Sequence, residues 1–333
     1  MFGSRSGDTP MMAPPVAIIN HHYCHPDGHG FVGLRGITPG ELDANVHELT
    51  AAGIPVRSLN EVLAGAGHDG LSVVFTFDDG LKDLKDHVLP VLRKHRVPAT
   101  FFVSSIPYTD QRLLHVHRVH LLQGALGCGE LGRRVRDSLR GTSSSEVPRD
   151  DERYGHLYPH DDETVRTLKI DLNYRLPYSV VDPMLQTIVE DTLGDEAELV
   201  RRFYLSRGEI EECLEAGLDL GLHSHSHPVM SRLSQAQQRE EIRLCRKFVR
   251  ETFGQDSVAF SYPYGVDGTY DARTVRLVAE DPGIVAGLTL ARRVAEAADL
   301  ESRWTIPRLD NRDVFGFDGR LRREALEMAS SGT

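Results

Sequence analysis

The 333-residue chain has four cysteines, one tryptophan and no long apolar run. The cysteines are scattered without CxxC spacing, which is typical of reduced thiols in a cytosolic protein. No segment approaches the roughly 18 to 20 apolar residues that are needed to span a bilayer. Arg5 is the only basic residue among the first 20, and the apolar run there is too short for a signal peptide. We therefore expect a cytoplasmic protein without a transmembrane segment.

An excess of basic residues is also missing. The formal net charge is −11, whereas binding to phosphate backbones needs a basic surface, so the composition argues against a nucleic-acid partner. Hydrophobic residues make up 40% of the chain, which is enough for a sizeable core. A length of 333 residues is within the range of a single α/β barrel.

Short apolar runs and helix-start signals alternate along the chain. Capping boxes of the S/T-x-x-E/Q type begin at Thr38, Ser206 and Ser234, and each opens an apolar helical stripe. Buried strands are expected at residues 16–19, 72–77, 99–103, 218–222, 258–262 and 284–290. This alternation predicts an α/β fold with a parallel sheet and outer helices, and a barrel or partly open barrel fits the number of repeats. The active site of such a fold lies at the C-terminal ends of the strands.

The alternation is interrupted between about residues 104 and 205. This stretch is mostly polar and contains the biased run GTSSSEVPRDDER, with helical fragments expected at residues 113–126 and 164–172. We interpret residues 104–205 as a largely helical, partly mobile insertion within a single domain of residues 16–333. Residues 1–15 are expected to be a flexible N-terminus.

Two polar motifs follow predicted strands. In TFDDG, one of Asp78 and Asp79 can bind a cation while the other accepts a proton; the alternative is a helix N-cap with a solvated neighbour. In HSHSHP, His223 and His227 have the i, i+4 spacing of one face of a helical turn, which suits a single metal ion, while His225 points elsewhere. A surface histidine tract is the alternative. Two histidines and one carboxylate leave coordination positions open, which is typical of a catalytic metal site.

A third motif, SYPYG at residues 261–265, is by itself a turn with packed aromatic rings. In this order the three motifs resemble the first three motifs of the polysaccharide deacetylases (the NodB-homology group, carbohydrate esterase family 4). The resemblance covers roughly residues 15–103 and 206–310 and implies a distorted (β/α) barrel with one divalent metal ion, often zinc. By motif position it implies Asp79, His223 and His227 as metal ligands, Asp78 as general base, and the backbone N–H of Tyr264 as a donor to the developing oxyanion.

The chain also departs from the family pattern. The arginine that normally stands two residues before the proline of the third motif, where it orients the base, is replaced by Ser261. Arg308 is expected to substitute for it from another strand, and a surface arginine is the alternative. The tryptophan of the usual fourth motif is not evident, because the single Trp304 lies in a different context.

The usual C-terminal catalytic histidine is absent as well, since no histidine follows His227. The run INHHY at residues 19–23 follows the first predicted strand. It resembles the element that opens a circularly permuted branch of the family, which acts on poly-N-acetylglucosamine and uses its early histidine as the acid. This resemblance predicts His22 as the general acid, with His21 as its rival; the alternative is an imidazole hydrogen-bonded at the barrel rim.

The expected function is a metal-dependent hydrolase that removes an N-acyl group, N-acetyl above all, from an amino sugar or sugar-containing intermediate. Its expected cofactor is one divalent ion, Zn²⁺ or another divalent transition metal. The missing export signal favours a small, lipid-linked or nucleotide-linked acetamido sugar or a glycoconjugate over an external polymer, and the insertion is expected to cover the site and set specificity. The alternatives are an O-acetylesterase, another C–N hydrolase acting on a non-sugar molecule, and a non-catalytic carbohydrate-binding protein that holds a metal.

Overall fold

A computed structural model describes residues 14–26, 34, 36–65, 70–140, 162–316, 320–322 and 324. The expected flexible N-terminus therefore falls almost entirely outside the described residues, and the run GTSSSEVPRDDER lies wholly outside them. Among the described residues, no helix is both long and apolar enough to cross a membrane.

The described strands form one parallel sheet of seven strands in the order β6-β5-β4-β3-β2-β1-β7. The strands are β1 (Val16–His21), β2 (Ser72–Phe77), β3 (Thr100–Val103), β4 (Asp219–Leu222), β5 (Val258–Ser261), β6 (Ile284–Leu288) and β7 (Leu309–Asp310). The six predicted strands are confirmed, and β7 was not predicted. Nearly all strand residues are buried, as is typical of parallel strands with both faces covered.

The sheet curls into a distorted, partly open barrel, which confirms the predicted fold class. Alternate residues of the strands enter different apolar clusters. Ile18, Val74 and Phe102 join one small cluster with residues of other strands, whereas Ala17 and Ile19 pack in the large cluster beneath the outer helices. At the open side, Leu288 of β6 forms a parallel bridge with Ile306, so the segment that leads to β7 also contacts the opposite edge.

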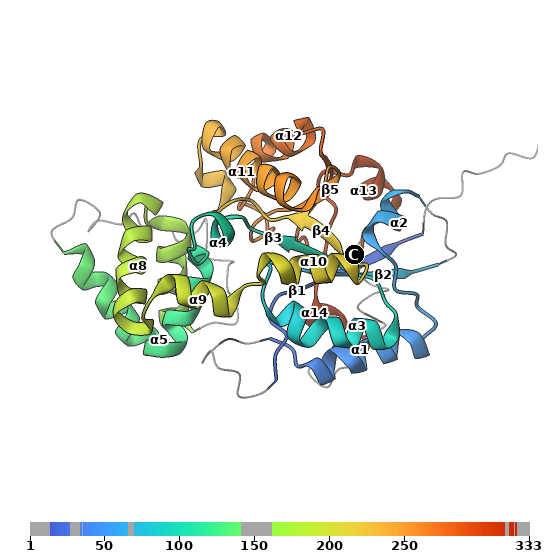
Figure 1. The fold of residues 1–333 in the computed structure, drawn as a ribbon, viewed down its shortest axis with the longest axis horizontal. Coiled ribbons are helices and arrows are strands. Elements are labelled where there is room, and N and C mark those ends of the chain that lie inside the picture. Colours follow the sequence, from blue (N-terminus) through green and yellow to red (C-terminus); the bar gives the residue numbers. More distant parts are fainter. Residues whose placement is uncertain are drawn as a thin grey trace, which may run out of the picture.

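Helices surround the barrel (Figure 1). The three predicted capping boxes are present at Thr38, Ser206 and Ser234 and begin α1, α10 and α11, respectively. The helical segments outside the insertion are α1 (Pro39–Ala51), α2 (Leu59–Leu63), η1 (Leu84–Val88), α3 (Leu89–His95), α10 (Arg207–Glu215), η3 (Met230–Arg232), α11 (Gln235–Phe253), α12 (Ala272–Glu280), α13 (Ala297–Ser302) and α14 (Asn311–Val314).

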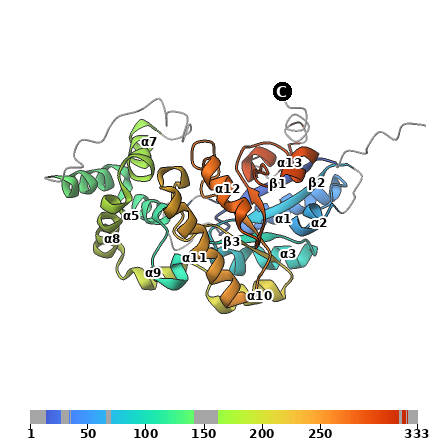
Figure 2. The same cartoon turned by 90° about the horizontal axis from the view of Figure 1, so that it is seen from above.

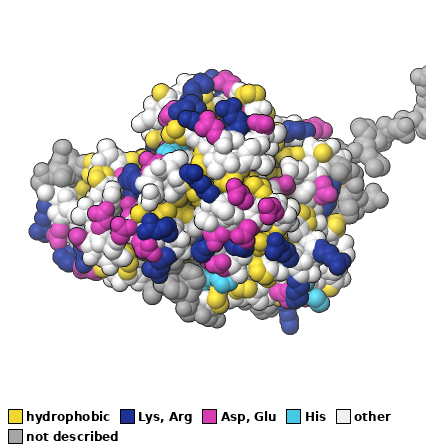
Figure 3. Space-filling model, viewed as in Figure 1, with side chains coloured by type: hydrophobic (Ala, Val, Ile, Leu, Met, Phe, Trp, Pro, Cys, Tyr) yellow, Lys and Arg dark blue, Asp and Glu magenta, His cyan; other side chains and the backbone are white. Residues whose placement is uncertain are grey.

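The stretch between β3 and α10 is a helical lobe beside the barrel (Figures 1 and 2). It contains α4 (Ile106–Thr109), α5 (His115–Leu139), α7 (Glu163–Ile170), η2 (Asp171–Arg175), α8 (Tyr178–Leu193) and α9 (Glu196–Phe203). Leucines and valines of α5, α8 and α9 form a hydrophobic cluster of their own. On the face of the molecule in Figure 3, acidic and basic side chains are interspersed over both lobe and barrel.

Candidate active site

Polar side chains meet just beyond the C-terminal ends of two strands, β2 and β4. Asp78 and Asp79 follow β2, and His223 follows β4; β3 separates the two strands in the sheet. All three side chains are buried, as is His227. Because all strands are parallel, these residues meet at the C-terminal edge, where the active sites of such folds lie.

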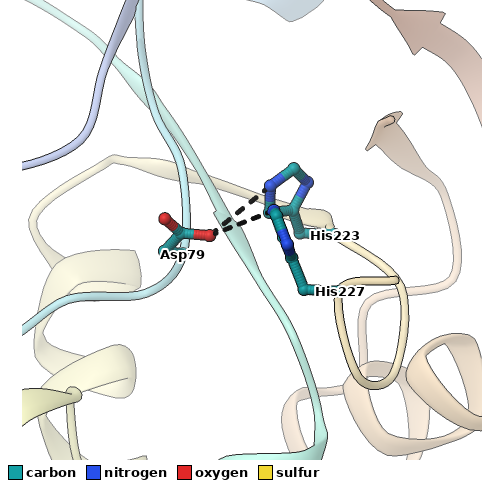
Figure 4. Close-up of side chains that lie close together, drawn as sticks. All are labelled: Asp79, His223 and His227. Carbon is teal, nitrogen blue, oxygen red and sulfur yellow. Dashed lines mark ion pairs between the residues drawn. The ribbon is translucent and has the colours of Figure 1, made fainter. Parts of the chain in front are cut away.

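Asp79, His223 and His227 converge on one point. The Asp79 Oδ1 atom lies 3.5 Å from His223 Nε2 and 3.7 Å from His227 Nε2. One candidate ligand atom from each residue lies within 4.8 Å of the others. Figure 4 shows the carboxylate facing both imidazole rings from a separate segment of the chain. The three residues expected to bind the metal are thus the ones that the structure gathers.

The predicted helical turn between the two histidines is wrong. Residues 223–227 form a loop, in which Ser224 and His227 have positive φ angles of 63° and 58°. The His227 N–H donates a hydrogen bond to Ser224 Oγ over 3.0 Å, which closes the loop. The loop rather than a helix face therefore brings the rings to a centroid distance of 4.7 Å. His225 points away, as predicted, and its Nδ1 contacts Ser105 Oγ at 2.8 Å.

Buried polar atoms without hydrogen-bond partners make the cluster suitable for a divalent cation. Among the described residues, Asp79 Oδ1 and His223 Nε2 are buried and have no hydrogen-bond partner. His223 Nδ1–H donates to the Ser261 carbonyl at 2.8 Å, which leaves the Nε2 lone pair for a cation. Burial, and then the charge of His223, lowers the pKa of His227 to about 3, so its imidazole is neutral at pH 7. Two imidazoles and one carboxylate are a ligand set that suits zinc.

Asp78 lies beside this cluster and pairs with Arg308. The guanidinium donates from Nη1 to Asp78 Oδ1 over 2.9 Å and from Nη2 to Oδ2 over 2.8 Å. Both side chains are 3% exposed or less, so this bidentate pair is shielded from water. Ser261 Oγ lies 3.3 Å from Asp78 Oδ2 and accepts a 2.8 Å hydrogen bond from Arg308.

Arg308 makes further contacts that fix its orientation. Its Nη1 also donates to Asn20 Oδ1 at 2.9 Å and to Thr76 Oγ1 at 3.2 Å, and its Nε donates to the Thr289 carbonyl at 3.1 Å. Burial by itself would raise the pKa of Asp78. The charge of Arg308, then that of His223 and the hydrogen bonds from Arg308 outweigh burial and lower the pKa to about 2. Asp78 is therefore a carboxylate at neutral pH, able to accept a proton.

The two candidate acids after β1 have different surroundings. His21 is buried, with Nε2 2.9 Å from Asn311 Oδ1 and Nδ1 3.3 Å from the Thr76 carbonyl, and burial lowers its pKa to about 4. His22 is half-buried and lines a cavity of about 440 Å³ with Tyr23 and Lys169. Both histidines line this cavity, but His21 is buried and hydrogen-bonded at both ring nitrogens, whereas His22 is more exposed.

Tyr264 lies next to the histidine cluster in the turn after β5. Its φ angle is 61°, and its ring centroid is 4.8 Å from that of His227. Gly265 follows with φ 66°, and a Cβ there would lie 2.8 Å from the Leu290 nitrogen. The turn therefore requires glycine at position 265, and it fixes Tyr264 beside the cluster. The role of its backbone N–H stays a prediction.

The sequence motifs missed one residue of the site, His117. It comes from α5 of the inserted lobe, and its Nε2 lies 3.2 Å from Asp79 Oδ2. The side chain is 1% exposed. Within the sequence HVHRVH it has neither a motif nor a strand end to mark it, so only the packing of the lobe against the barrel reveals the contact.

Comparisons with known proteins point to one family. The family described as polysaccharide deacetylase matches residues 66–120 and 185–286. These segments contain Asp78, Asp79, His223 and His227 but neither His22 nor Arg308, so the roles predicted for those two residues stay predictions. No curated protein matches the chain.

Solved structures resemble the whole chain at low sequence identity. The Streptococcus pyogenes deacetylase PplD in complex with acetate is 15% identical, and the alignment covers 90% of this chain and 92% of that one with a TM-score of 0.54. IcaB from Ammonifex degensii is 16% identical, with coverages of 96% and 97% and a TM-score of 0.53. At such identities the likeness shows the fold alone. The family match contains all three sequence motifs, and it confirms the predicted resemblance of the chain to the polysaccharide deacetylases.

Proposed function

We propose that this protein is a metal-dependent N-deacetylase that hydrolyses the acetamido group of an amino sugar. The observation that carries the proposal is the buried cluster of Asp79, His223 and His227, whose ligand atoms converge beside a carboxylate held by Arg308. Zn²⁺ is the cation that these ligands favour. When bound, a divalent cation there would polarise the amide carbonyl and lower the pKa of a water molecule.

Each protein side chain then has a distinct task. Asp78 accepts the proton of the attacking water, and Arg308 keeps its carboxylate ionised and oriented. The water oxygen forms the new bond to the carbonyl carbon, and the Tyr264 N–H donates to the oxyanion that develops there. The C–N bond breaks as His22 protonates the nitrogen, which leaves as the sugar amine while acetate is released.

The substrate is proposed to be a carbohydrate that enters beside the inserted lobe. His22 lines the 440 Å³ cavity together with Lys169 of α7, so barrel and lobe both contribute to its wall. A cavity of this size accommodates a sugar ring and part of its aglycone. This shared wall supports the proposal that the lobe selects among acetamido sugars.

The test is acetate release from a panel of substrates by the zinc-loaded protein. The panel contains N-acetylglucosamine oligomers, a nucleotide-linked N-acetylhexosamine and an O-acetylated sugar. We expect release from at least one amide substrate, and we expect Asp78→Asn to retain about one equivalent of zinc while turnover falls about 10²- to 10⁴-fold. Release from the ester alone would make the protein an esterase, and full amide turnover by Asp78→Asn would refute the mechanism.

A further inference from the structure

Helix α5 of the inserted lobe reaches into the metal cluster through one side chain. His117 lies in its first turn, and its Nε2 contacts Asp79 Oδ2 at 3.2 Å. The other carboxylate oxygen, Oδ1, is the one that faces His223 and His227. One oxygen of Asp79 therefore contacts the lobe, and the other faces the two histidines.

The hydrogen bonds around His117 define its tautomer. The backbone N–H of Leu114 donates to the Tyr204 hydroxyl oxygen at 3.0 Å, and that hydroxyl lies 2.5 Å from His117 Nδ1. Burial raises the pKa of Tyr204 well above 10, so the hydroxyl keeps its hydrogen. The Asp79 carboxylate can only accept, so His117 carries its hydrogen on Nε2 and donates it to Oδ2. In that tautomer Nδ1 accepts from the Tyr204 hydroxyl, whose oxygen accepts from Leu114.

Packing holds the hydrogen-bonded residues Tyr204, His117 and Asp79 in place. His117 and Tyr204 are each 1% exposed, and the Phe203 ring meets the imidazole edge-on at a centroid distance of 4.9 Å. His117 lies near the start of the lobe and Tyr204 at its end, shortly before α10, so both ends of the lobe contribute to these hydrogen bonds. A carboxylate that binds a cation through one oxygen needs a hydrogen bond to the other, because an unpaired buried oxygen is costly.

We propose that His117 is a positioning residue, oriented by Tyr204, that holds Asp79 so that Oδ1 is presented to the cation. The inference rests on the metal site of the proposed function. It makes the inserted lobe a structural part of the metal centre, in addition to its place at the substrate cavity. His117 does not occupy a ligand position, because it contacts the carboxylate oxygen that is not shared with the two histidines.

The test compares the Zn²⁺ dissociation constants of full-length variants by competition with a chromophoric chelator. His117→Phe keeps a ring but no donor, and we expect its Zn²⁺ affinity to fall about 10- to 100-fold. His117→Gln keeps an N–H near the position of Nε2, and we expect it to recover most of that loss. Tyr204→Phe removes only the hydroxyl and should weaken binding in the same direction by less.

A matched control lies one turn along the same helix. His120 is half-buried, and its Nδ1 contacts the Tyr23 hydroxyl at 3.0 Å and not Asp79, so His120→Phe should bind Zn²⁺ like the wild type. Folded His117→Phe with wild-type affinity would overturn the inference. If that variant does not fold, unchanged affinity in Tyr204→Phe would overturn it. A wild-type protein that binds no Zn²⁺ would refute the proposed metal site itself, and this inference with it.

Discussion

Replacing Arg308 by methionine should weaken the fold and release the carboxylate of Asp78 at the same time. Arg308 is 1% exposed and holds both oxygens of Asp78. Methionine fills much of the same volume but donates no hydrogen bond. Removing one partner of a buried ion pair leaves the other charge uncompensated, which typically costs about 3 to 5 kcal/mol.

The pKa of Asp78 gives an independent estimate of the magnitude. It is lowered from 3.8 to about 2 although burial acts in the opposite direction. Since each pKa unit corresponds to about 1.4 kcal/mol, the ionised carboxylate is stabilised by roughly 2.5 kcal/mol net. The favourable interactions with Arg308, His223 and His22 together exceed this value, and Arg308 contributes the largest share. The sign follows from a folded-state pKa below the unfolded one. The stabilisation is complete above about pH 4 and is lost as the pH falls towards 2.

A double-mutant cycle measures this coupling. The wild type, Asp78→Asn, Arg308→Met and the double variant would be unfolded by urea at pH 7 without metal. We expect the double variant to be about 1 to 3 kcal/mol more stable than the sum of the single losses predicts. The exposed pair of Arg243 and Glu240, 2.6 Å apart, is the control and should couple far more weakly because solvent screens it. Losses at Asp78 and Arg308 that add within about 0.5 kcal/mol would refute the reasoning.

Two further predictions concern the neighbouring histidines. His22→Gln should lower kcat for an acetamido sugar about 10²- to 10⁴-fold with little change in thermal stability, and an equal catalytic loss in His21→Gln would contradict the assignment of the acid. Burial lowers the pKa of His21 to about 4 from 6.5, so as the pH falls the imidazole is protonated in the unfolded chain before it is protonated in the folded protein. The free energy of unfolding is therefore at its full value above about pH 6.5 and declines as the pH falls towards 4. The free energy of unfolding is expected to fall by about 2.5 kcal/mol between pH 7 and 4.5. Urea denaturation at a series of pH values should show a shallower decline for His21→Gln than for the wild type, and equal declines would contradict the prediction.

Local signals in the sequence were sufficient to predict most strands and several helices of the barrel. The capping boxes at Thr38, Ser206 and Ser234 begin helices as predicted, because each box satisfies backbone donors within four residues. The buried strands could be predicted for the same reason, since a strand covered on both faces is apolar along its length. From parallel strands it follows that Asp79 and His223 share one edge of the sheet.

Contacts made across the fold could not be predicted in this way. The approach of His223 to His227 depends on two left-handed residues, Ser224 and His227, whereas the i, i+4 spacing suggested a helix. His117 reaches Asp79 only because the lobe packs on the barrel, and no local pattern encodes that docking. Helices α8 and α9 were missed because the polar stretch conceals an apolar stripe that pairs with α5 and not with the sheet.

The position of Arg308 explains why serine stands at position 261. The two residues approach Asp78 from different directions, because β5 lies on the β4 side of the carboxylate and Arg308 lies just before β7, beyond β1. Ser261 Oγ lies 3.3 Å from Asp78 and accepts from Arg308, so the small hydroxyl occupies the space where the guanidinium and the carboxylate meet. A second arginine at position 261 would place two cations and a longer side chain in a fully buried site around one carboxylate, which is unfavourable in both volume and charge. The buried site therefore has room for one arginine beside Asp78, and Arg308 occupies that space.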